Sequence, residues 1–176
     1  MVSFVLTGPE STGKSDLSLQ LSEHFNGWVV KEYARHYVEN LSGEYTFEDV
    51  ELIARQQIVD YNRALNKSGK EQPVFFDTFL IITKVWFEEV FNCCPLWLHQ
   101  AIQTYKIDYA LLCAPDLPWA ADGVRENPHL RAYLFDRYAM ELDYYGIPYN
   151  IVRGQGEKRL LNAISIVEAF HQPVSL

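Results

Sequence analysis

The stretch Gly8-Pro9-Glu10-Ser11-Thr12-Gly13-Lys14-Ser15 decides the fold of this chain. It fits the pattern G-x-x-x-x-G-K-[ST] in full, and it lies between an apolar run at 3–7 and a helical pattern. The two glycines allow the backbone to turn its N–H groups, together with the positive end of the following helix, toward an anion. The Lys14 ammonium can contact the β- and γ-phosphates, and the Ser15 hydroxyl can ligate Mg²⁺. The stretch therefore predicts a loop that binds a polyphosphate.

On the C-terminal side of this loop, helical and strand patterns alternate along the chain. Strands are expected at 3–7, 28–31, 73–76, 108–113 and 148–152, and helices at 14–25, 33–41, 47–67, 78–90, 96–105, 129–145 and 157–171. Thr46 and Asp49 have the spacing of a capping box for the helix at 47–67. The alternation predicts an α/β P-loop NTPase fold, in which a five-stranded parallel sheet carries helices on both faces. We expect one domain, 1–176, with a lid segment at about 115–131.

Composition and charge narrow the range of functions. The chain is 48% hydrophobic and 22% charged, which is typical of a globular protein. Its formal net charge of −8 argues against a nucleic-acid binder, which normally carries a basic surface. Charged residues interrupt the apolar run at 74–87, so no membrane span is expected. Cys93, Cys94 and Cys113 lack zinc-site spacing and indicate reduced thiols, and the N-terminal apolar run is too short for a signal peptide; both features favour a cytoplasmic protein.

Two carboxylates follow predicted strands at the edge where a parallel sheet binds its ligands. Glu32 comes after the strand at 28–31, and Asp77 ends an apolar run as the Mg²⁺-binding carboxylate of a Walker B sequence does. Phosphoryl transfer needs a metal ligand and often a base beside the acceptor hydroxyl. Asp77 is alternatively a helix cap, and Glu32 a surface ion pair with Arg35. Glu10 can also face the acceptor, and spacing alone does not decide which carboxylate is the base.

The segment at 115–131 contains three prolines, and a loop of that length in a compact domain is usually functional. We interpret it as a lid, whose Arg125, together with Arg131, is a candidate to stabilise charge on the γ-phosphate; the alternative is surface arginines on a connector. Gly154 and Gly156 let the backbone pass close to a flat base, or form a plain turn. The guanine-binding N-K-x-D pattern is absent from the sequence, which favours ATP over GTP. The expected nucleotide-binding residues are Gly8, Glu10, Ser11, Thr12, Gly13, Lys14, Ser15, Arg131, Gly154 and Gly156.

Four segments together resemble a known family. They are the phosphate loop, Glu32-Tyr33-Ala34-Arg35-His36-Tyr37-Val38, Phe76-Asp77-Thr78 and Pro118-Trp119-Ala120-Ala121-Asp122-Gly123-Val124-Arg125. They occur in the same order in the nicotinamide riboside kinase domain of NadR-type proteins, which the chain resembles from its first strand to its last helix. The resemblance implies ATP and Mg²⁺ as cofactors, and phosphorylation of the 5′-hydroxyl of nicotinamide riboside to give nicotinamide mononucleotide.

The same resemblance assigns roles to individual residues. It implies that Lys14 and Ser15 hold phosphate and metal, that Glu32 and Asp77 line the acceptor and metal site, and that Arg125 belongs to the lid. The candidates for the riboside pocket are Tyr33, Arg35, Tyr37, Trp119 and Asp122. An aromatic face suits the cationic nicotinamide ring, although tyrosines at helical spacing are alternatively core residues.

Other functions remain open at this point. The same motifs fit a kinase for another nucleoside or small metabolite, and also an ATPase module that acts with a protein partner. No segment corresponds to the adenylyltransferase or DNA-binding parts of full-length NadR proteins, so neither activity is expected. We therefore expect ATP and a small nucleoside-like acceptor as ligands, and neither nucleic acid nor a membrane as a partner.

Overall fold

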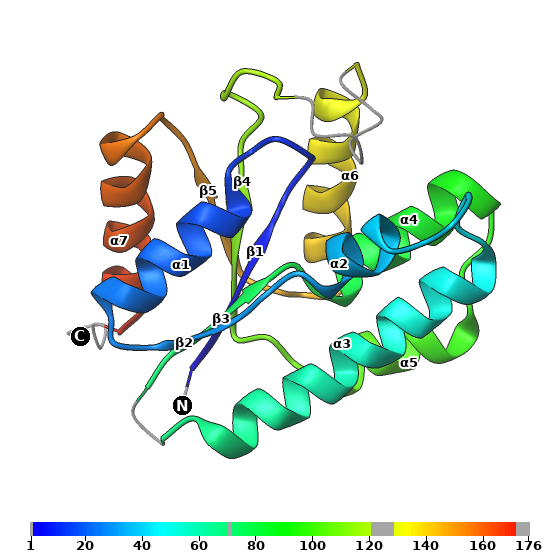
Figure 1. Cartoon of the computed structure of the whole chain (residues 1–176). Helices are drawn as coiled ribbons and strands as arrows, with labels where there is room; N and C mark the ends of the chain where they lie inside the picture. Colours follow the sequence, from blue (N-terminus) through cyan, green and yellow to red (C-terminus); the bar gives the residue numbers. More distant parts are fainter. Residues whose placement is uncertain (1, 70–71, 121–128, 172–176) are drawn as a thin grey trace.

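A computed structural model describes residues 2–69, 72–120 and 129–171, and within them a five-stranded sheet lies between two layers of helices (Figure 1). The strands are β1 (Ser3–Thr7), β2 (Trp28–Val30), β3 (Val74–Asp77), β4 (Tyr109–Cys113) and β5 (Tyr149–Val152). They lie in the order β2-β3-β1-β4-β5, and each neighbouring pair is parallel. Parallel neighbours need crossover connections, and helices supply them here. The predicted fold class is confirmed.

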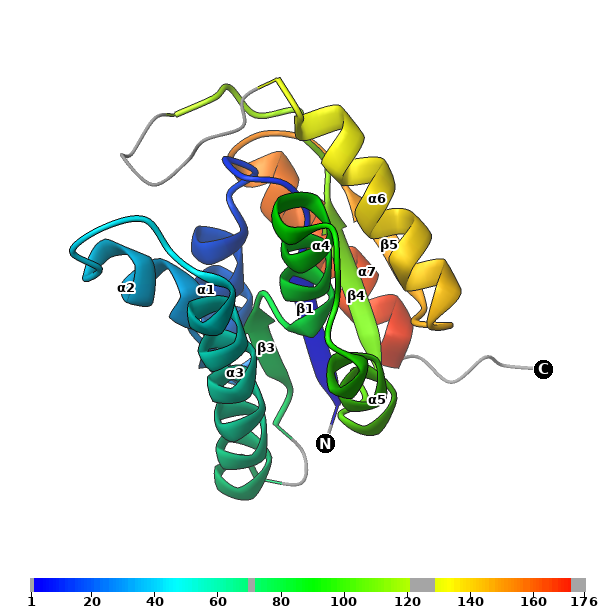
Figure 2. The same cartoon turned by 90° about the vertical axis from the view of Figure 1, so that its right-hand side faces the viewer.

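The helices in the described ranges cover both faces of this sheet. They are α1 (Lys14–His24), α2 (Tyr33–Glu39), α3 (Phe47–Lys67), α4 (Leu80–Phe91), α5 (Leu96–Thr104), α6 (Arg131–Tyr144) and α7 (Glu157–His171). Helices α1 and α7 lie on one face, and α3, α4, α5 and α6 lie on the other, as the two views at right angles show (Figures 1 and 2).

Each face of the sheet has its own apolar core, because alternate residues of a strand point to opposite faces. Val5 packs with α3, α4 and α5, whereas Phe4 and Leu6 pack with α1 and α7. On α1, Leu17 and Leu21 are four residues apart and both are buried, which fixes the face that this helix turns to the sheet. Truncating such a residue to alanine costs about 2–5 kcal/mol.

The helix boundaries differ from the predictions in ways that backbone geometry explains. The capping box is confirmed: Thr46 Oγ1 accepts from the Asp49 N–H, and Asp49 Oδ2 accepts from the Thr46 N–H at 2.8 Å. The helix expected from residue 78 begins at Leu80, because Thr78 has φ 70° and Phe79 is extended at the cap position. Asp77 is therefore not the helix cap.

In the described ranges, none of the helices combines the length and apolar character needed to cross a bilayer. The three cysteines carry free thiols, of which Cys113 is buried and Cys93 is exposed.

Candidate nucleotide and acceptor site

The phosphate loop connects β1 to α1 at the carboxyl edge of the sheet. Gly8 has φ 136°, and a Cβ there would lie 2.6 Å from the carbonyl oxygen of Cys113, so only glycine fits against β4. Gly13 has φ 73° and is the N-cap of α1. Lys14 bends back over the loop, and its Nζ donates to the carbonyls of Gly8 (2.9 Å) and Pro9 (2.8 Å). The lysine charge is therefore held against the loop, and its contact with phosphate stays a prediction.

Arg159 of α7, which sequence reasoning missed, donates hydrogen bonds to the phosphate loop and to the segments that follow β4 and β5. This side chain is 4% exposed. Its Nη2 donates to the carbonyls of Thr12 (2.8 Å) and Ala114 (3.1 Å), and its Nη1 donates to Asp116 Oδ1 (2.7 Å) and to the Gly154 carbonyl (3.0 Å). A signal was present in the sequence, because Arg159 lies four residues before Ala163 and eight before Val167, in line with the buried side of α7.

The two glycines after β5 belong to the same assembly. Gly154 has φ 95° and donates its N–H to Asp116 Oδ2 at 2.8 Å, and Gly156 has φ 54°. Both positions thus require the left-handed region that glycine favours. Neither residue lines the cavity described next, so their contact with a base stays a prediction.

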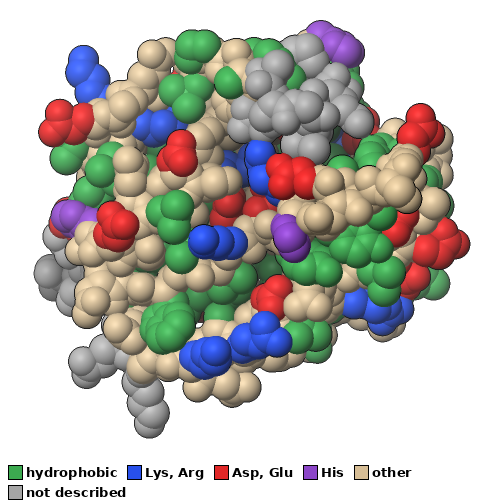
Figure 3. Space-filling view, viewed as in Figure 1, with side chains coloured by type: hydrophobic (Ala, Val, Ile, Leu, Met, Phe, Trp, Pro, Cys, Tyr) green, Lys and Arg blue, Asp and Glu red, His purple; other side chains and the backbone are tan. Residues whose placement is uncertain are grey.

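A cavity of about 730 Å³ begins at the phosphate loop and extends between α2, α3, α4 and α6. Figure 3 shows acidic and basic side chains side by side around a hollow near the centre of this face. The charged residues of the lining are Glu10, Lys14, Asp16, Glu32, Arg35 and Glu89, and the aromatic ones are Tyr45, Trp86 and Tyr138. Phosphate-binding and aromatic surfaces therefore share one cavity.

Glu32 lies at the N-cap position of α2 and faces this cavity. Burial raises the pKa of its carboxyl; the nearby charge of Asp77 adds to this rise, and Lys14 and Arg35 oppose it. The ion pair with Arg35 that the sequence suggested is present but long, with Arg35 Nε 3.7 Å from Glu32 Oε2. Glu32 is thus positioned for chemistry in the cavity as well as for that ion pair.

Asp77 ends β3 and is 4% exposed. Its Oδ1 is buried and has no hydrogen-bond partner among the described residues. Burial raises the pKa of Asp77, while a hydrogen bond from Ser15 and the Lys14 charge lower it. A buried carboxylate oxygen without a donor, beside the P-loop hydroxyl, fits Mg²⁺ or a water molecule bound to it.

The predicted riboside tyrosines lie elsewhere on α2. Tyr33 and Tyr37 do not line the cavity; their rings are 5.9 Å apart, and the Tyr37 hydroxyl donates to Asp49 Oδ1 at 2.7 Å, which fastens α2 to α3. The side of α2 that faces the cavity carries Ala34, Arg35 and Val38. Of the remaining candidates in the described part of the chain, Arg35 and Trp119, Arg35 alone is on the cavity wall.

The lid candidates are only partly described. Arg131 donates to the carbonyls of Leu117 (2.9 Å) and Ser11 (3.1 Å), so it ties the start of α6 to the phosphate loop. Trp119 is half-buried and does not line the cavity. Asp122 and Arg125 lie outside the described residues. Their roles at the substrate and the γ-phosphate stay predictions.

Sequence reasoning also missed the wall formed by α3, α4 and α6. Gln57 Oε1 accepts a hydrogen bond from Thr83 Oγ1 at 2.8 Å, and the rings of Tyr45 and Trp86 meet edge to face at 4.9 Å. Tyr138 is buried, and burial, followed by the charges of Glu10, Glu32 and Glu89, raises its pKa. Nothing in the sequence separates these positions from ordinary core positions at helical spacing.

The loop between β1 and α1, with β1 between β3 and β4, defines a P-loop nucleotide-binding protein. Within this class, the chain belongs to the AAA domain family, whose pattern matches residues 3–159.

Similar proteins share this domain at low identity. The trifunctional NAD biosynthesis/regulator protein NadR of Escherichia coli is 30% identical over 126 residues, which cover 68% of this chain and 30% of that protein. A tRNA dimethylallyltransferase of Leuconostoc mesenteroides is 26% identical over 170 residues, 93% of this chain and 54% of that protein. A solved NadR structure in complex with NR superposes with a TM-score of 0.80 at 20% identity, over 99% of this chain and 52% of that one. The chain thus spans about a third to a half of the length of these NadR proteins.

Proposed function

We propose that this chain is an ATP-dependent kinase that transfers the γ-phosphoryl group to the 5′-hydroxyl of nicotinamide riboside. The observation that carries the proposal is that one cavity joins the phosphate loop, Glu32 and three aromatic side chains, those of Tyr45, Trp86 and Tyr138. A nucleotide phosphate and a flat acceptor can be bound next to each other in such a space, which orients them for transfer. The similarity to NadR, one of whose structures is a complex with NR and another a complex with NAD and AMP-PNP, supports the acceptor and the nucleotide.

Residues of the loop bind and orient the phosphates in this mechanism. The backbone N–H groups and the α1 N-terminus face the phosphate oxygens, and Lys14 exchanges its two carbonyl partners for the β- and γ-phosphates. Ser15 and Asp77 fit Mg²⁺, which neutralises charge on the phosphates when it is bound.

Glu32 is the better candidate for the base. It lines the cavity, whereas Asp77 does not. Because burial raises its pKa, Glu32 accepts a proton more readily than an ordinary glutamate does. In the proposed step, Glu32 takes the proton of the 5′-hydroxyl as that oxygen attacks the γ-phosphorus and ADP leaves.

The test is an ADP-release assay with ATP, Mg²⁺ and a panel of acceptors: nicotinamide riboside, adenosine, cytidine, thymidine and none. We expect release that depends on an acceptor and is fastest with nicotinamide riboside, and none from Lys14→Ala. Faster turnover of another nucleoside would identify a different nucleoside kinase. Slow release that no acceptor changes would instead indicate an ATPase module.

A separate experiment tests the activity for which the similar tRNA dimethylallyltransferase is named. Purified tRNA and dimethylallyl diphosphate replace the acceptor and ATP, and transfer is followed by mass spectrometry. The net charge of −8 and the carboxylates of the cavity disfavour an RNA acceptor, so no transfer is expected. Modified tRNA would contradict the kinase proposal.

A further inference from the structure

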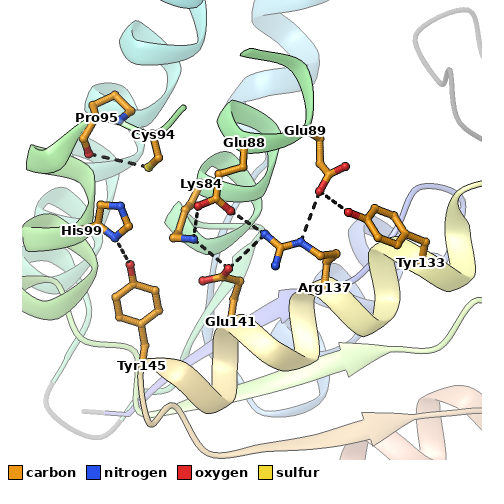
Figure 4. Close-up of polar contacts among 10 residues, drawn as sticks. All are labelled: Lys84, Glu88, Glu89, Cys94, Pro95, His99, Tyr133, Arg137, Glu141 and Tyr145. Carbon is orange, nitrogen blue, oxygen red and sulfur yellow. Dashed lines mark hydrogen bonds and ion pairs between the residues drawn. The ribbon is translucent and has the colours of Figure 1, made fainter. Parts of the chain in front are cut away.

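A network of charged side chains joins α4 to α6 beside the cavity (Figure 4). Lys84, which is buried, donates to Glu88 Oε1 at 2.6 Å and to Glu141 Oε1 at 2.8 Å. Arg137 Nη2 lies 2.6 Å from Glu88 Oε2 and 3.3 Å from Glu141 Oε1, and its Nε lies 3.4 Å from Glu89 Oε1. Three carboxylates thus share two cations, which leaves one negative charge in the network.

That remaining charge lies mainly at Glu89. Glu88 and Glu141 each contact both Lys84 and Arg137, whereas Glu89 contacts only Arg137 among the described cations, and at a longer distance. Glu89 is also the member of the network that lines the cavity.

Helix α6 fixes the orientation of this carboxylate. The Tyr133 hydroxyl donates to Glu89 Oε1 at 2.8 Å, and Arg137 Nε meets the same oxygen (Figure 4). Within the described part of the chain, both of these contacts fall on Oε1 and not on Oε2. Glu89 therefore holds a fixed position with one oxygen available to a ligand.

Other acidic groups strengthen the negative potential of this space. Glu10 and Glu32 line the same cavity. Burial raises the pKa of Tyr138, and the negative charges of Glu10, Glu32 and Glu89 raise it further, so the three carboxylates act on the same space. The two cations of the lining, Lys14 and Arg35, already have partners near the phosphate loop: Lys14 contacts the loop carbonyls, and Arg35 contacts Glu32.

An aromatic surface lies next to Glu89. Trp86 is three residues earlier on α4, both residues line the cavity, and the ring of Tyr45 packs against the Trp86 ring. Residues three apart on a helix are neighbours on its surface. A flat cation gains attraction from an aromatic face and from a carboxylate at once, whereas a neutral ring of the same shape gains only the packing.

We propose that Glu89 determines acceptor specificity by charge, and that the acceptor site selects N-ribosides whose aromatic base carries a positive charge. The inference rests on the proposed function and names the property of the acceptor that the site recognises. A base that also carries a carboxylate is disfavoured, because its negative charge meets Glu89, Glu10 and Glu32 in the same cavity.

Three ribosides of nearly the same shape separate charge from shape. Nicotinamide riboside is cationic, its reduced dihydropyridine form is neutral with the same carboxamide, and nicotinic acid riboside adds a carboxylate. The measurement is kcat/KM by ADP release at saturating ATP and Mg²⁺. We expect the unmodified protein to prefer the cation over each of the others by at least about tenfold, since unit charges a few ångströms apart interact strongly at the effective dielectric of a protein.

Glu89→Gln removes the charge and keeps the shape and the hydrogen bond from Tyr133. We expect it to lower kcat/KM for nicotinamide riboside about tenfold and to leave the neutral form nearly unchanged, so the preference approaches one. The matched control is Glu88→Gln, which removes the same charge from the same network one residue away but does not line the cavity. It should keep the preference of the unmodified protein.

The outcomes are distinguishable. A preference that survives in Glu89→Gln, or that falls equally in Glu88→Gln, overturns the proposal for Glu89. If the unmodified protein phosphorylates none of the three ribosides, the proposed function fails instead. Calorimetric binding of the cationic and neutral forms then tests charge selection separately, and equal Kd values for the two would overturn it.

Discussion

Replacing Arg159 with methionine tests whether one buried guanidinium holds the phosphate loop in place. The side chain is 4% exposed and donates to three carbonyls and to Asp116 Oδ1, at distances of 2.7 to 3.1 Å. Hydrogen bonds from a charged group contribute about 1.5–3 kcal/mol each and do not add fully. The buried carbonyls of Thr12 and Ala114 would also be left without this donor, at a cost of about 1–3 kcal/mol each, so we expect Arg159→Met to lose about 4 kcal/mol of unfolding free energy.

Urea and thermal unfolding followed by circular dichroism measure this loss. For a chain of this length, about 2–4 °C of Tm corresponds to each kcal/mol, so Tm should fall by about 8–16 °C. The KM for ATP should rise as well, because the Thr12 carbonyl loses its donor and the loop is less fixed. The matched control is Arg153→Met, an exposed arginine between β5 and α7, which should stay within about 0.5 kcal/mol. A loss below about 1 kcal/mol for Arg159→Met would refute the conclusion that the Arg159 guanidinium holds the phosphate loop in place.

Three further substitutions follow from the site. Lys14→Ala should lower kcat at least about 100-fold in the ADP-release assay while circular dichroism shows an unchanged fold, because Lys14 acts on bound phosphate. Asp77→Asn should shift the Mg²⁺ titration of turnover to higher concentration, and an identical titration would remove Asp77 from the metal site. Burial raises the pKa of Glu32, so folding favours its protonated form, and the stability from this group falls as pH rises above its ordinary pKa of 4.5. Glu32→Gln should therefore raise Tm at pH 7, by about 2–4 °C for a gain of about 1 kcal/mol, while it abolishes turnover. In the unmodified protein, the acid limb of the pH–rate profile should lie above that ordinary value.

Much of the fold could be predicted because its signals are local. The apolar run before Gly8 and the helical pattern after Lys14 fix the first strand and helix, and the capping box at Thr46 fixes the start of α3. The start of α4 could not be predicted in the same way. Thr78 adopts φ 70°, a conformation that β-branched residues rarely take, and the bond from its N–H to the Leu6 carbonyl depends on tertiary structure.

In the candidate site, too, the residues with local sequence signals could be predicted, and those that depend on tertiary structure could not. Residues at strand ends and in the loop could be placed, because the carboxyl edge of a parallel sheet gathers them, as with Lys14 and Glu32. Periodicity groups Tyr33 with Tyr37 on one side of α2, but it does not say which neighbour that side meets, and it meets α3. For the same reason, Trp86 and Tyr138 could not be distinguished from core residues.

The central position of β1 also has a consequence for how the chain is made. The ribosome produces β1 long before its two partners, since Ser3 pairs with Val74 and Phe4 pairs with Tyr109. An apolar strand with both edges unpaired must therefore wait for most of the chain, and contacts between such distant residues slow folding. During that interval, the unpaired edges of β1 are open to aggregation, which makes chaperone dependence and yield in the cell sensitive to the rate of synthesis up to β4.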